Sequence, residues 1–268
     1  MTGPNICIIT KDMDAVWHFD GDWNQIGGPA AEINSDGDWG LIQRGAPAND
    51  AFYLGGDGQW ENMKGPRGRY SVGGDTVYAV PNTLFPEAPH GVYQFDGNAG
   101  NGEPIWSKIG GPSFNGGVLA GNWGVLAAPD GLGDLWRYTG TPNQWEVIAP
   151  NKGRDDVAIA DTVYRKAYAP DWRIYRYNGN GTAWTPVTDQ LVAHAVVMRA
   201  GNWGFVYTDY DVDSMFRFTG GQFVKIGPHR PYFAVADDTV YAIPINKSGV
   251  YRYDGGDDVD EYRWPSPK

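Results

Sequence analysis

A short motif recurs seven times along this chain of 268 residues. Each copy has an apolar residue, an aromatic residue, a polar residue or tyrosine, a second apolar or aromatic residue, and a turn that ends in glycine. The copies begin 35 to 43 residues apart, at Val16, Ala51, Val92, Leu135, Ile174, Met215 and Val250. A near-constant period of this size indicates a repeat protein, whose neighbouring units bury a shared core.

Each repeat divides into four short apolar runs separated by Gly, Asn, Asp or Pro. The clearest example has its runs at residues 233–236, 239–243, 250–253 and 260–264. Asp-Gly or Asn-Gly follows several of the third runs, as expected where a hairpin needs positive φ. Four antiparallel strands per repeat of about 40 residues predict a β-propeller blade. We therefore expect an all-β fold: a β-propeller of seven blades of four short antiparallel strands, with an exception for the first blade that is described next, in a single domain over residues 1–268.

The first repeat is one run short. Residues 6–9 match a second strand, and only five residues precede them. We expect a three-stranded first blade, or one completed by a stub formed by residues 1–5. Six blades with a spare segment is the alternative.

Two series of side chains recur at fixed places in the repeat. Tryptophans in the fourth run are expected to pack the repeat: Trp23, Trp60, Trp106, Trp145 and Trp184. Arginines in the third run are expected on a solvated face, because arginine buries its stem and keeps its charged end in water: Arg137, Arg176, Arg217 and Arg252.

The turn between the first and second runs alternates between two types, which a purely structural repeat would not need. One type has Asp or Asn, then Trp-Gly, and its copies are 84 and 80 residues apart: Asp38-Trp39, Asn122-Trp123 and Asn202-Trp203. The other type has Asp-Thr-Val, beginning at Asp75, Asp161 and Asp238. This alternation indicates a two-blade unit repeated three times.

The Trp-Gly pairs form the candidate ligand-binding site, which comprises Asp38, Trp39, Asn122, Trp123, Asn202 and Trp203. A glycine beside an indole leaves one ring face without a neighbouring side chain. The apolar face of a sugar can stack on such a ring while its hydroxyls bond to Asp or Asn. The alternative is structural: each tryptophan wedges between blades, and the glycine makes room for it.

Several phrases of the repeat resemble the tectonin and tachylectin-2-like propeller lectins. These are Thr76-Val-Tyr-Ala-Val80, Thr239-Val-Tyr-Ala-Ile243, Gly249-Val-Tyr-Arg-Tyr253 and Trp106-Ser-Lys-Ile-Gly110. Members of those families bind carbohydrates such as N-acetylglucosamine or O-methylated sugars at several equivalent sites. The resemblance implies a class of ligand and no particular binding residues, since the repeat length here differs.

Composition argues against other classes of function. The net charge of −11 repels nucleic acid and anionic membranes, no apolar run is long enough to span a bilayer, and the single Cys7 excludes an internal disulfide. No spacing typical of a transition-metal site is present, and the short acidic clusters match no complete calcium loop. We expect no metal, no cofactor and no catalytic residue, although His194 is the best histidine candidate for a central-channel site.

The sequence thus predicts a multivalent lectin whose partners are glycans or glycoconjugates. Weak sites gain strength when several engage a clustered ligand. The alternatives are a protein-interaction scaffold or an enzyme with a single central-channel site. With no signal peptide in the sequence, we expect a protein that is cytoplasmic or released without a cleavable signal.

Overall fold

Strands account for all the regular secondary structure in the part of the chain that the computed structural model describes. The described residues are 6–9, 12–19, 22–36, 39–43, 50–54, 59–73, 76–81, 90–111, 117–121, 123–127, 133–151, 156–167, 170–188, 196–201, 203–230, 232–236, 239–243, 249–253, 255 and 262–264. Within them, no helix is long and apolar enough to cross a membrane.

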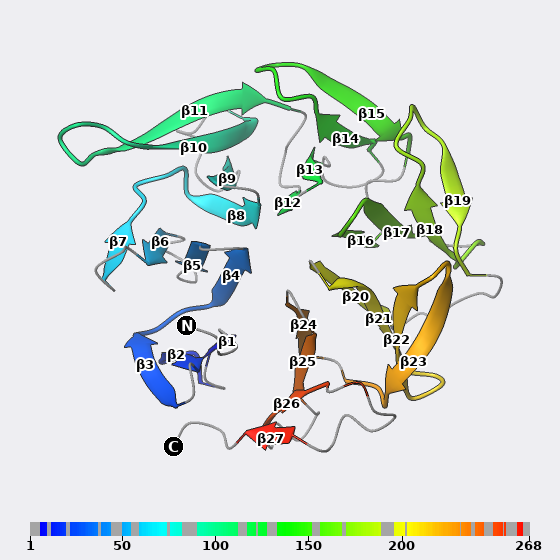
Figure 1. Ribbon diagram of the computed structural model, residues 1–268. Helices are drawn as coiled ribbons and strands as arrows, with labels where there is room; N and C mark the ends of the chain where they lie inside the picture. The colour runs from blue at the N-terminus through cyan, green and yellow to red at the C-terminus, as the bar shows by residue number, and fades with distance from the viewer. Residues whose placement is uncertain are drawn as a thin grey trace. The chain divides into compact units, whose positions relative to one another are not determined.

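The strands form a β-propeller arrangement in which each sheet contains strands that are consecutive in the chain (Figure 1). Among the described residues, six sheets have four strands and the first sheet has three. The prediction of four-stranded blades with a three-stranded first sheet is confirmed. The predicted count of seven blades is not matched: among the described residues six blades are complete, and β1 of the three-stranded first sheet corresponds to a second strand.

The chain forms two compact units, the first comprising Met1–Ala120 and Gly124–Val147, with Pro267. The single domain predicted over residues 1–268 therefore stays a prediction. The strands that belong wholly or mainly to the first unit are β1 (Ile6–Ile9), β2 (Val16–Phe19) and β3 (Trp23–Gly27); β4 (Glu32–Asp36), β5 (Trp39–Gln43), β6 (Ala51–Leu54) and β7 (Trp60–Asn62); β8 (Gly68–Gly73), β9 (Thr76–Pro81), β10 (Val92–Asn98) and β11 (Pro104–Gly110); β12 (Val118–Gly121), β13 (Gly124–Ala127), β14 (Leu135–Tyr138) and β15 (Trp145–Ala149).

The second unit comprises Gly121–Trp123 and Ile148–Ser266, with Lys268. Its three blades consist of β16 (Asp156–Ile159), β17 (Val163–Lys166), β18 (Ile174–Tyr177) and β19 (Trp184–Pro186); β20 (Val196–Gly201), β21 (Gly204–Asp209), β22 (Ser214–Thr219) and β23 (Gln222–Gly227); β24 (Tyr232–Val235), β25 (Val240–Ile243), β26 (Val250–Arg252) and β27 (Tyr262–Trp264).

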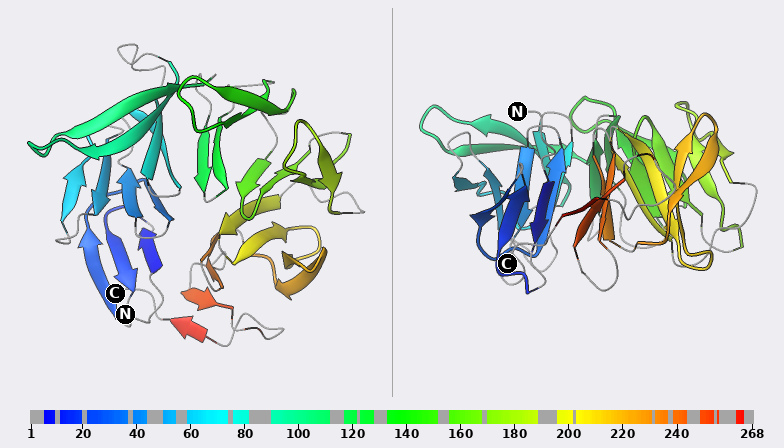
Figure 2. Two further views of the ribbon diagram at one scale, coloured as in Figure 1. Left: turned by 45° about the horizontal axis from the view of Figure 1, so that its top comes forward. Right: turned by 60° about the horizontal axis from the view of Figure 1, so that its bottom comes forward.

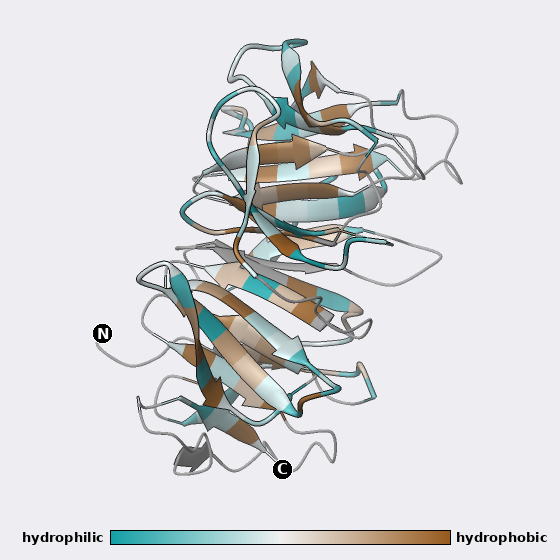
Figure 3. Ribbon diagram, turned by 90° about the vertical axis from the view of Figure 1, so that its right-hand side faces the viewer, coloured by the Kyte–Doolittle hydropathy of each residue, from teal (hydrophilic) through white to brown (hydrophobic). Residues whose placement is uncertain are grey.

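The hydrophobic core lies between successive sheets within each unit. In the second unit, one cluster joins Met215 and Ile226 of the β20–β23 blade to Phe233 and Val240 of the next blade. In the first unit, another cluster joins the β4–β7 blade to the β8–β11 blade in the same way. Figure 3 shows hydrophobic residues along the strands and hydrophilic residues at many of the turns. The sheets that lie between two others of the same unit, such as β4–β7 and β20–β23, therefore bury apolar side chains on two faces.

The first residue of the recurring motif is the most consistently buried position of the repeat. All seven copies are between 0% and 3% exposed: Val16, Ala51, Val92, Leu135, Ile174, Met215 and Val250. The aromatic residue three positions later is also buried in several copies, including Tyr177. Residues three apart on a strand point to opposite faces, so these third strands are covered on both sides.

The positive φ predicted for the glycines that follow the third-strand motif is confirmed where these glycines are described. Gly97, Gly179 and Gly255 have φ values of +98°, +84° and +98°. Glycine adopts this left-handed backbone conformation at little cost, whereas a residue with a Cβ atom is strained there. At Asn178-Gly179 the chain thus reverses into β19. Gly97 instead lies inside β10 at a bulge, and the chain reverses after it, at residues 99–102.

The hairpin of β10 and β11 is the longest in the first unit and extends beside the β4–β7 blade (Figure 2). Its end is fixed to that blade by polar contacts. Asn98 donates to the hydroxyl of Tyr53 at 3.1 Å, and Lys64 forms an ion pair with Glu103 at 2.7 Å.

Candidate functional site

The structure describes part of the candidate ligand-binding site. Asp38, Asn122 and Asn202 lie outside the described residues, and of Trp39 only the backbone is described, at the start of β5. Trp123 and Trp203 are described in full. Both are half-buried and stand directly before a second strand, β13 or β21. The binding role assigned to these six residues stays a prediction, and the structure shows the surroundings of two of them, Trp123 and Trp203.

Trp203 is in contact with an arginine of its own blade. The guanidinium carbon of Arg217 lies 3.6 Å from the centre of the indole ring, a cation–π geometry. Arg217 Nη2 also donates to the carbonyl oxygen of Trp203 at 2.7 Å, and burial lowers the pKa of this arginine. The expectation that Arg217 lies on a solvated face is therefore wrong. The cause is the cross-strand register, which places it beside the Trp-Gly turn.

The ring of Trp203 also meets the next blade. It lies 5.7 Å from the ring of Tyr253, at a tilt of 59°, and packs against the cluster that contains Phe233 and Val240. Its backbone N–H donates to the carbonyl oxygen of Ala236 at 3.0 Å. Trp203 thus has the wedging contacts of the structural alternative, and the indole is only partly accessible.

Trp123 has equivalent surroundings. Its ring lies 5.5 Å from that of Tyr177 at an interplanar angle of 85°, an edge-to-face contact. Gly124, which follows it, adopts a φ of +149°, and Gly204 adopts +126° at the equivalent place after Trp203. The repeat therefore reproduces the same local structure in two blades.

A second glycine, two residues before each tryptophan, permits close approach of the next blade. A Cβ atom added at Gly201 would lie 2.5 Å from the carbonyl oxygen of Val235 in β24. One added at Gly121 would lie 3.1 Å from the side chain of Ile159 in β16. The first glycine of the Gly-Asn-Trp-Gly motif thus allows the neighbouring strand to approach closely.

The Asp-Thr-Val turns are instead connected to the third strand of their own blade by a hydrogen bond. The threonine hydroxyl donates to the carbonyl oxygen of the aromatic residue in or just after the third strand. Thr239 donates to Tyr253 at 2.6 Å and Thr162 to Tyr177 at 3.2 Å, and Thr76 makes the same bond to Phe95. Tyr177 and Tyr253 are also the residues whose rings meet Trp123 and Trp203. Within the second unit, the Trp-type β20–β23 blade therefore packs on the Thr-type β24–β27 blade that follows it.

Indole N–H groups of the fourth strands connect successive blades. Each donates to a backbone carbonyl oxygen in or just after the preceding fourth strand: Trp106 to Met63 at 2.8 Å, Trp145 to Ile109 at 3.0 Å, Trp184 to Ile148 at 2.7 Å, and Trp60 to Ile26. The predicted packing role of these tryptophans is confirmed. Trp23 of the first sheet differs, since its indole nitrogen is buried without a hydrogen-bond partner among the described residues.

The β16–β19 blade departs from the repeat in its second strand. Arg165 and Lys166 occupy positions that hold Ala79 and Val80 in β9, and they are 7% and 1% exposed. The guanidinium of Arg165 lies 4.8 Å from the rings of both Tyr175 and Trp184. Lys166 Nζ lies 5.3 Å from the ring of Trp172. Aligning the seven second runs shows this Arg-Lys pair as an exception, a signal that the sequence analysis missed.

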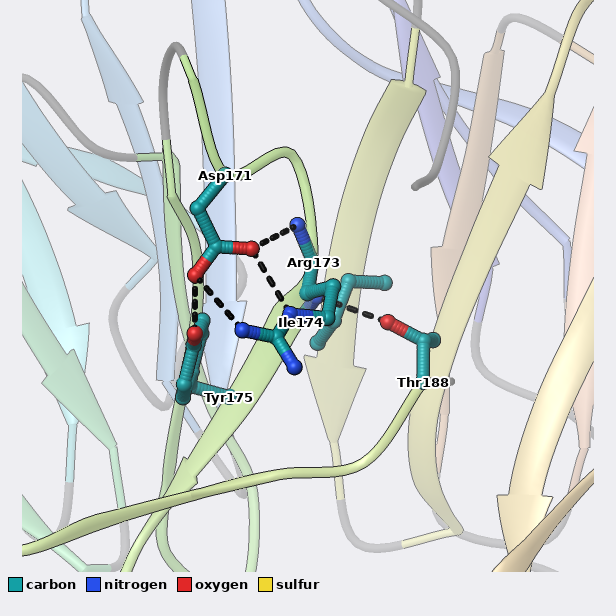
Figure 4. A network of polar contacts seen from close by, with 5 residues as sticks. All are labelled: Asp171, Arg173, Ile174, Tyr175 and Thr188. Atoms are coloured by element: carbon teal, nitrogen blue, oxygen red, sulfur yellow. Dashed lines mark hydrogen bonds and ion pairs between the residues drawn. The ribbon is translucent and has the colours of Figure 1, made fainter. Parts of the chain in front are cut away.

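A network centred on Asp171 closes the loop between β17 and β18 (Figure 4). Arg173 donates to the Asp171 carboxylate from Nε at 2.7 Å and from Nη2 at 3.1 Å, and the Tyr175 hydroxyl donates to Oδ2. These bonds, chiefly those from Arg173, lower the pKa of Asp171 to about 2. The carboxylate is thus held as an anion by groups of its own blade.

Other polar groups named by the sequence do not converge on one place. Among the described residues, no group of three or more His, Cys, Asp or Glu side chains could hold a metal ion. Asp209 accepts a backbone N–H bond from Asp211, as a turn-capping carboxylate does. Asp213 accepts one from His229, which follows β23. Burial raises the pKa of Cys7 to about 11, which disfavours its thiolate. His194 lies outside the described residues.

Comparison with known proteins places the chain in a fold class. No family model and no curated protein match the sequence. Among solved structures, the β-propeller domain of the Trilobed protease from Pyrococcus furiosus matches with a TM-score of 0.62 and 10% identity, over 94% of this chain and 91% of that one. A chain of the mitotic checkpoint complex matches with a TM-score of 0.59 and 11% identity, over 91% and 84%.

A third match is a catalytically inactive variant of virginiamycin B lyase from Staphylococcus aureus, solved with quinupristin. Its TM-score is 0.57 at 10% identity, over 94% of this chain and 92% of that chain. Identities this low show the fold alone, and the three proteins differ in function. The class that fold and comparisons define is the β-propeller, and the tectonin resemblance stays an expectation.

Proposed function

We propose that the protein is a multivalent carbohydrate-binding protein whose sites are the Trp-Gly turns. The observation that carries this proposal is the equivalence of two of these turns. Trp123 and Trp203 are both half-buried, each followed by a glycine with positive φ and each beside a tyrosine of the next blade. Equivalent sites at a regular period are what multivalent recognition of a clustered glycan requires.

The contacts of Trp203 restrict the part of its indole ring that a sugar could reach. Arg217 lies over the indole ring, so the sugar would contact the accessible remainder of the indole rather than both faces. The carboxamide of Asn202 would supply hydrogen bonds to sugar hydroxyls, because an amide both donates and accepts. Each such site is small, and its affinity alone would be weak, on the order of millimolar.

A glycan array with the labelled protein tests the proposal, followed by variants against any hit. Trp123→Ala and Trp203→Ala should each reduce apparent binding about tenfold or more on a clustered glycan, because fewer sites engage at once. Asn202→Ala keeps the indole and should also weaken binding. Trp23→Phe is the matched control, since it changes a tryptophan outside these turns and should leave binding unaltered.

Circular dichroism and thermal unfolding of every variant separate lost binding from lost folding. A folded Asn202→Ala protein with unchanged binding, together with a folded Trp variant that binds normally, would refute the assignment of the site. A blank array with folded wild-type protein would refute glycan binding itself.

A protein-interaction scaffold is the second candidate, favoured by one exposed apolar turn. Tyr210 and Val212, between β21 and β22, are 62% and 58% exposed. Exposed apolar side chains that lie together often mark contact sites for other proteins. The double variant Tyr210→Ser, Val212→Ser should abolish capture of a protein partner while leaving glycan binding intact, which distinguishes the two candidates.

A further inference from the structure

Among the described residues, the first sheet has three strands and each of the other six has four. β1 pairs with β2 in the register Ile8 to Trp17, just as β17 pairs with β18 in the register Arg165 to Tyr175. Trp17 and Tyr175 are the second residues of their motif copies, so β1 occupies the place of a second strand. In the other six sheets, a first strand pairs with the far side of that strand. Among the described residues, no strand pairs with this side of β1.

An unpaired strand edge is a binding surface for backbone. Roughly half of the N–H and C=O groups of β1 point away from β2, because successive residues of an antiparallel strand alternate in direction. Such a row of donors and acceptors is a template for a further strand. β1 also lies next to β4, the first strand of the adjacent blade. This side of β1, where the structure describes no paired strand, is therefore continuous with the first strand of the adjacent blade.

First strands elsewhere in the chain show which side chains this place suits. In β20, Met198 is buried and Arg199 is exposed; in β8, Tyr70 is buried and Arg69 is exposed; in β24, Phe233 is buried between the exposed residues Tyr232 and Ala234. A suitable strand thus has a large apolar residue on one face and a small or basic residue on the other. A basic residue also suits the net charge of −11 and the exposed Glu32 on β4.

We propose that the edge of β1 binds an extended segment of another polypeptide by β-strand addition. The segment has four to six residues, with apolar side chains alternating with basic or small ones and no proline. Main-chain hydrogen bonds would supply the affinity, and the alternating side chains the specificity. This interaction is independent of the proposed glycan sites, which lie on different elements.

Amide hydrogen exchange of the full-length protein tests the proposal. In the free protein, some amides of Ile6–Ile9 should exchange at least about tenfold faster than those of Val163–Lys166, which have strands on both sides. The probe is a synthetic peptide with the sequence of β20, Val-Val-Met-Arg-Ala-Gly. Adding it should slow exchange at Ile6–Ile9 and leave Val163–Lys166 unchanged.

Two control peptides check the chemistry. A peptide with proline in place of its methionine loses a main-chain donor and should give no protection. A peptide with glutamate in place of its arginine should bind more weakly, because the protein is acidic.

Two results would overturn the proposal. One is slow exchange at Ile6–Ile9 in the free protein, equal to that of Val163–Lys166, which means that the edge is already filled. The other is no protection by the β20 peptide at up to about 1 mM.

Discussion

Single residues account for the way in which successive blades are fixed. The indole N–H of Trp106 donates to the carbonyl oxygen of Met63, and three further tryptophans make the equivalent bond. A sequence can predict that such tryptophans pack, because they recur. The acceptor could not be predicted, because it lies about one repeat earlier, and only the folded stack of sheets places it there.

Replacing Trp106 with Phe should lower the free energy of unfolding by about 1–3 kcal/mol, because the Met63 carbonyl loses its donor and the indole volume is lost. Urea unfolding measures the change. Trp23→Phe is the matched control, since its indole nitrogen has no hydrogen-bond partner among the described residues, and it should cost less. Equal losses in the two variants would show that the hydrogen bond contributes nothing.

The lowered pKa of Asp171 predicts that part of the free energy of unfolding is lost at acid pH. Its pKa is lowered to about 2, chiefly by the bonds from Arg173, against an ordinary value of about 3.9 in the unfolded chain. A lowered folded-state pKa stabilises the protein above that ordinary value, and this contribution is lost as pH falls through the interval from about 4 to 2. Asp171→Asn should therefore be less stable than wild type at pH 7 and lose less stability across that interval.

Thermal unfolding at several pH values checks this prediction. Asp22→Asn is the control, because Asp22 is exposed in the turn before β3. A pH profile of Asp171→Asn parallel to that of the wild type would contradict the role assigned to the carboxylate.

At the scale of elements, the turn between the first and second strands determines how one blade meets the next. The sequence alone predicted the strands, the hairpin glycines and the alternation of the two turn types, since these follow from local pattern. It left open whether Trp203 binds a ligand or packs, because that depends on contacts across strands. Arg217 and Tyr253 reach the indole from positions 14 and 50 residues later in the chain.

Gly201→Ala tests the close approach of blades at these turns. A Cβ atom there would lie 2.5 Å from the backbone oxygen of Val235, so one strand must move. We expect a loss of about 2 kcal/mol or more in the free energy of unfolding. Gly117→Ala is the control, because a Cβ atom at Gly117 would meet nothing within 4 Å and φ there is not positive. Denaturant unfolding of both variants gives the comparison, and equal stability would refute the close contact.

At the scale of the whole molecule, repetition gave the fold class but not every detail. The four-stranded blade and the β-propeller class were predicted correctly, because a 35- to 43-residue period and strand-like runs leave few alternatives. Seven blades were expected, whereas six complete blades are present among the described residues, beside a three-stranded first sheet. The burial of Arg165 and Lys166 was not predicted, because the prediction rested on features that the repeats share and these two residues occur in one repeat.

Multivalency is the molecular property on which the proposed function depends, and it requires that equivalent turns bind the same ligand. The most direct measurement is a heteronuclear NMR titration of the indole N–H resonances with a glycan that binds on the array. The account predicts that the resonances of Trp123 and Trp203 shift together, while those of Trp106, Trp145 and Trp184, engaged with backbone carbonyls, stay in place. A glycan that binds and leaves Trp123 and Trp203 unshifted, or a protein that binds no glycan, would contradict it.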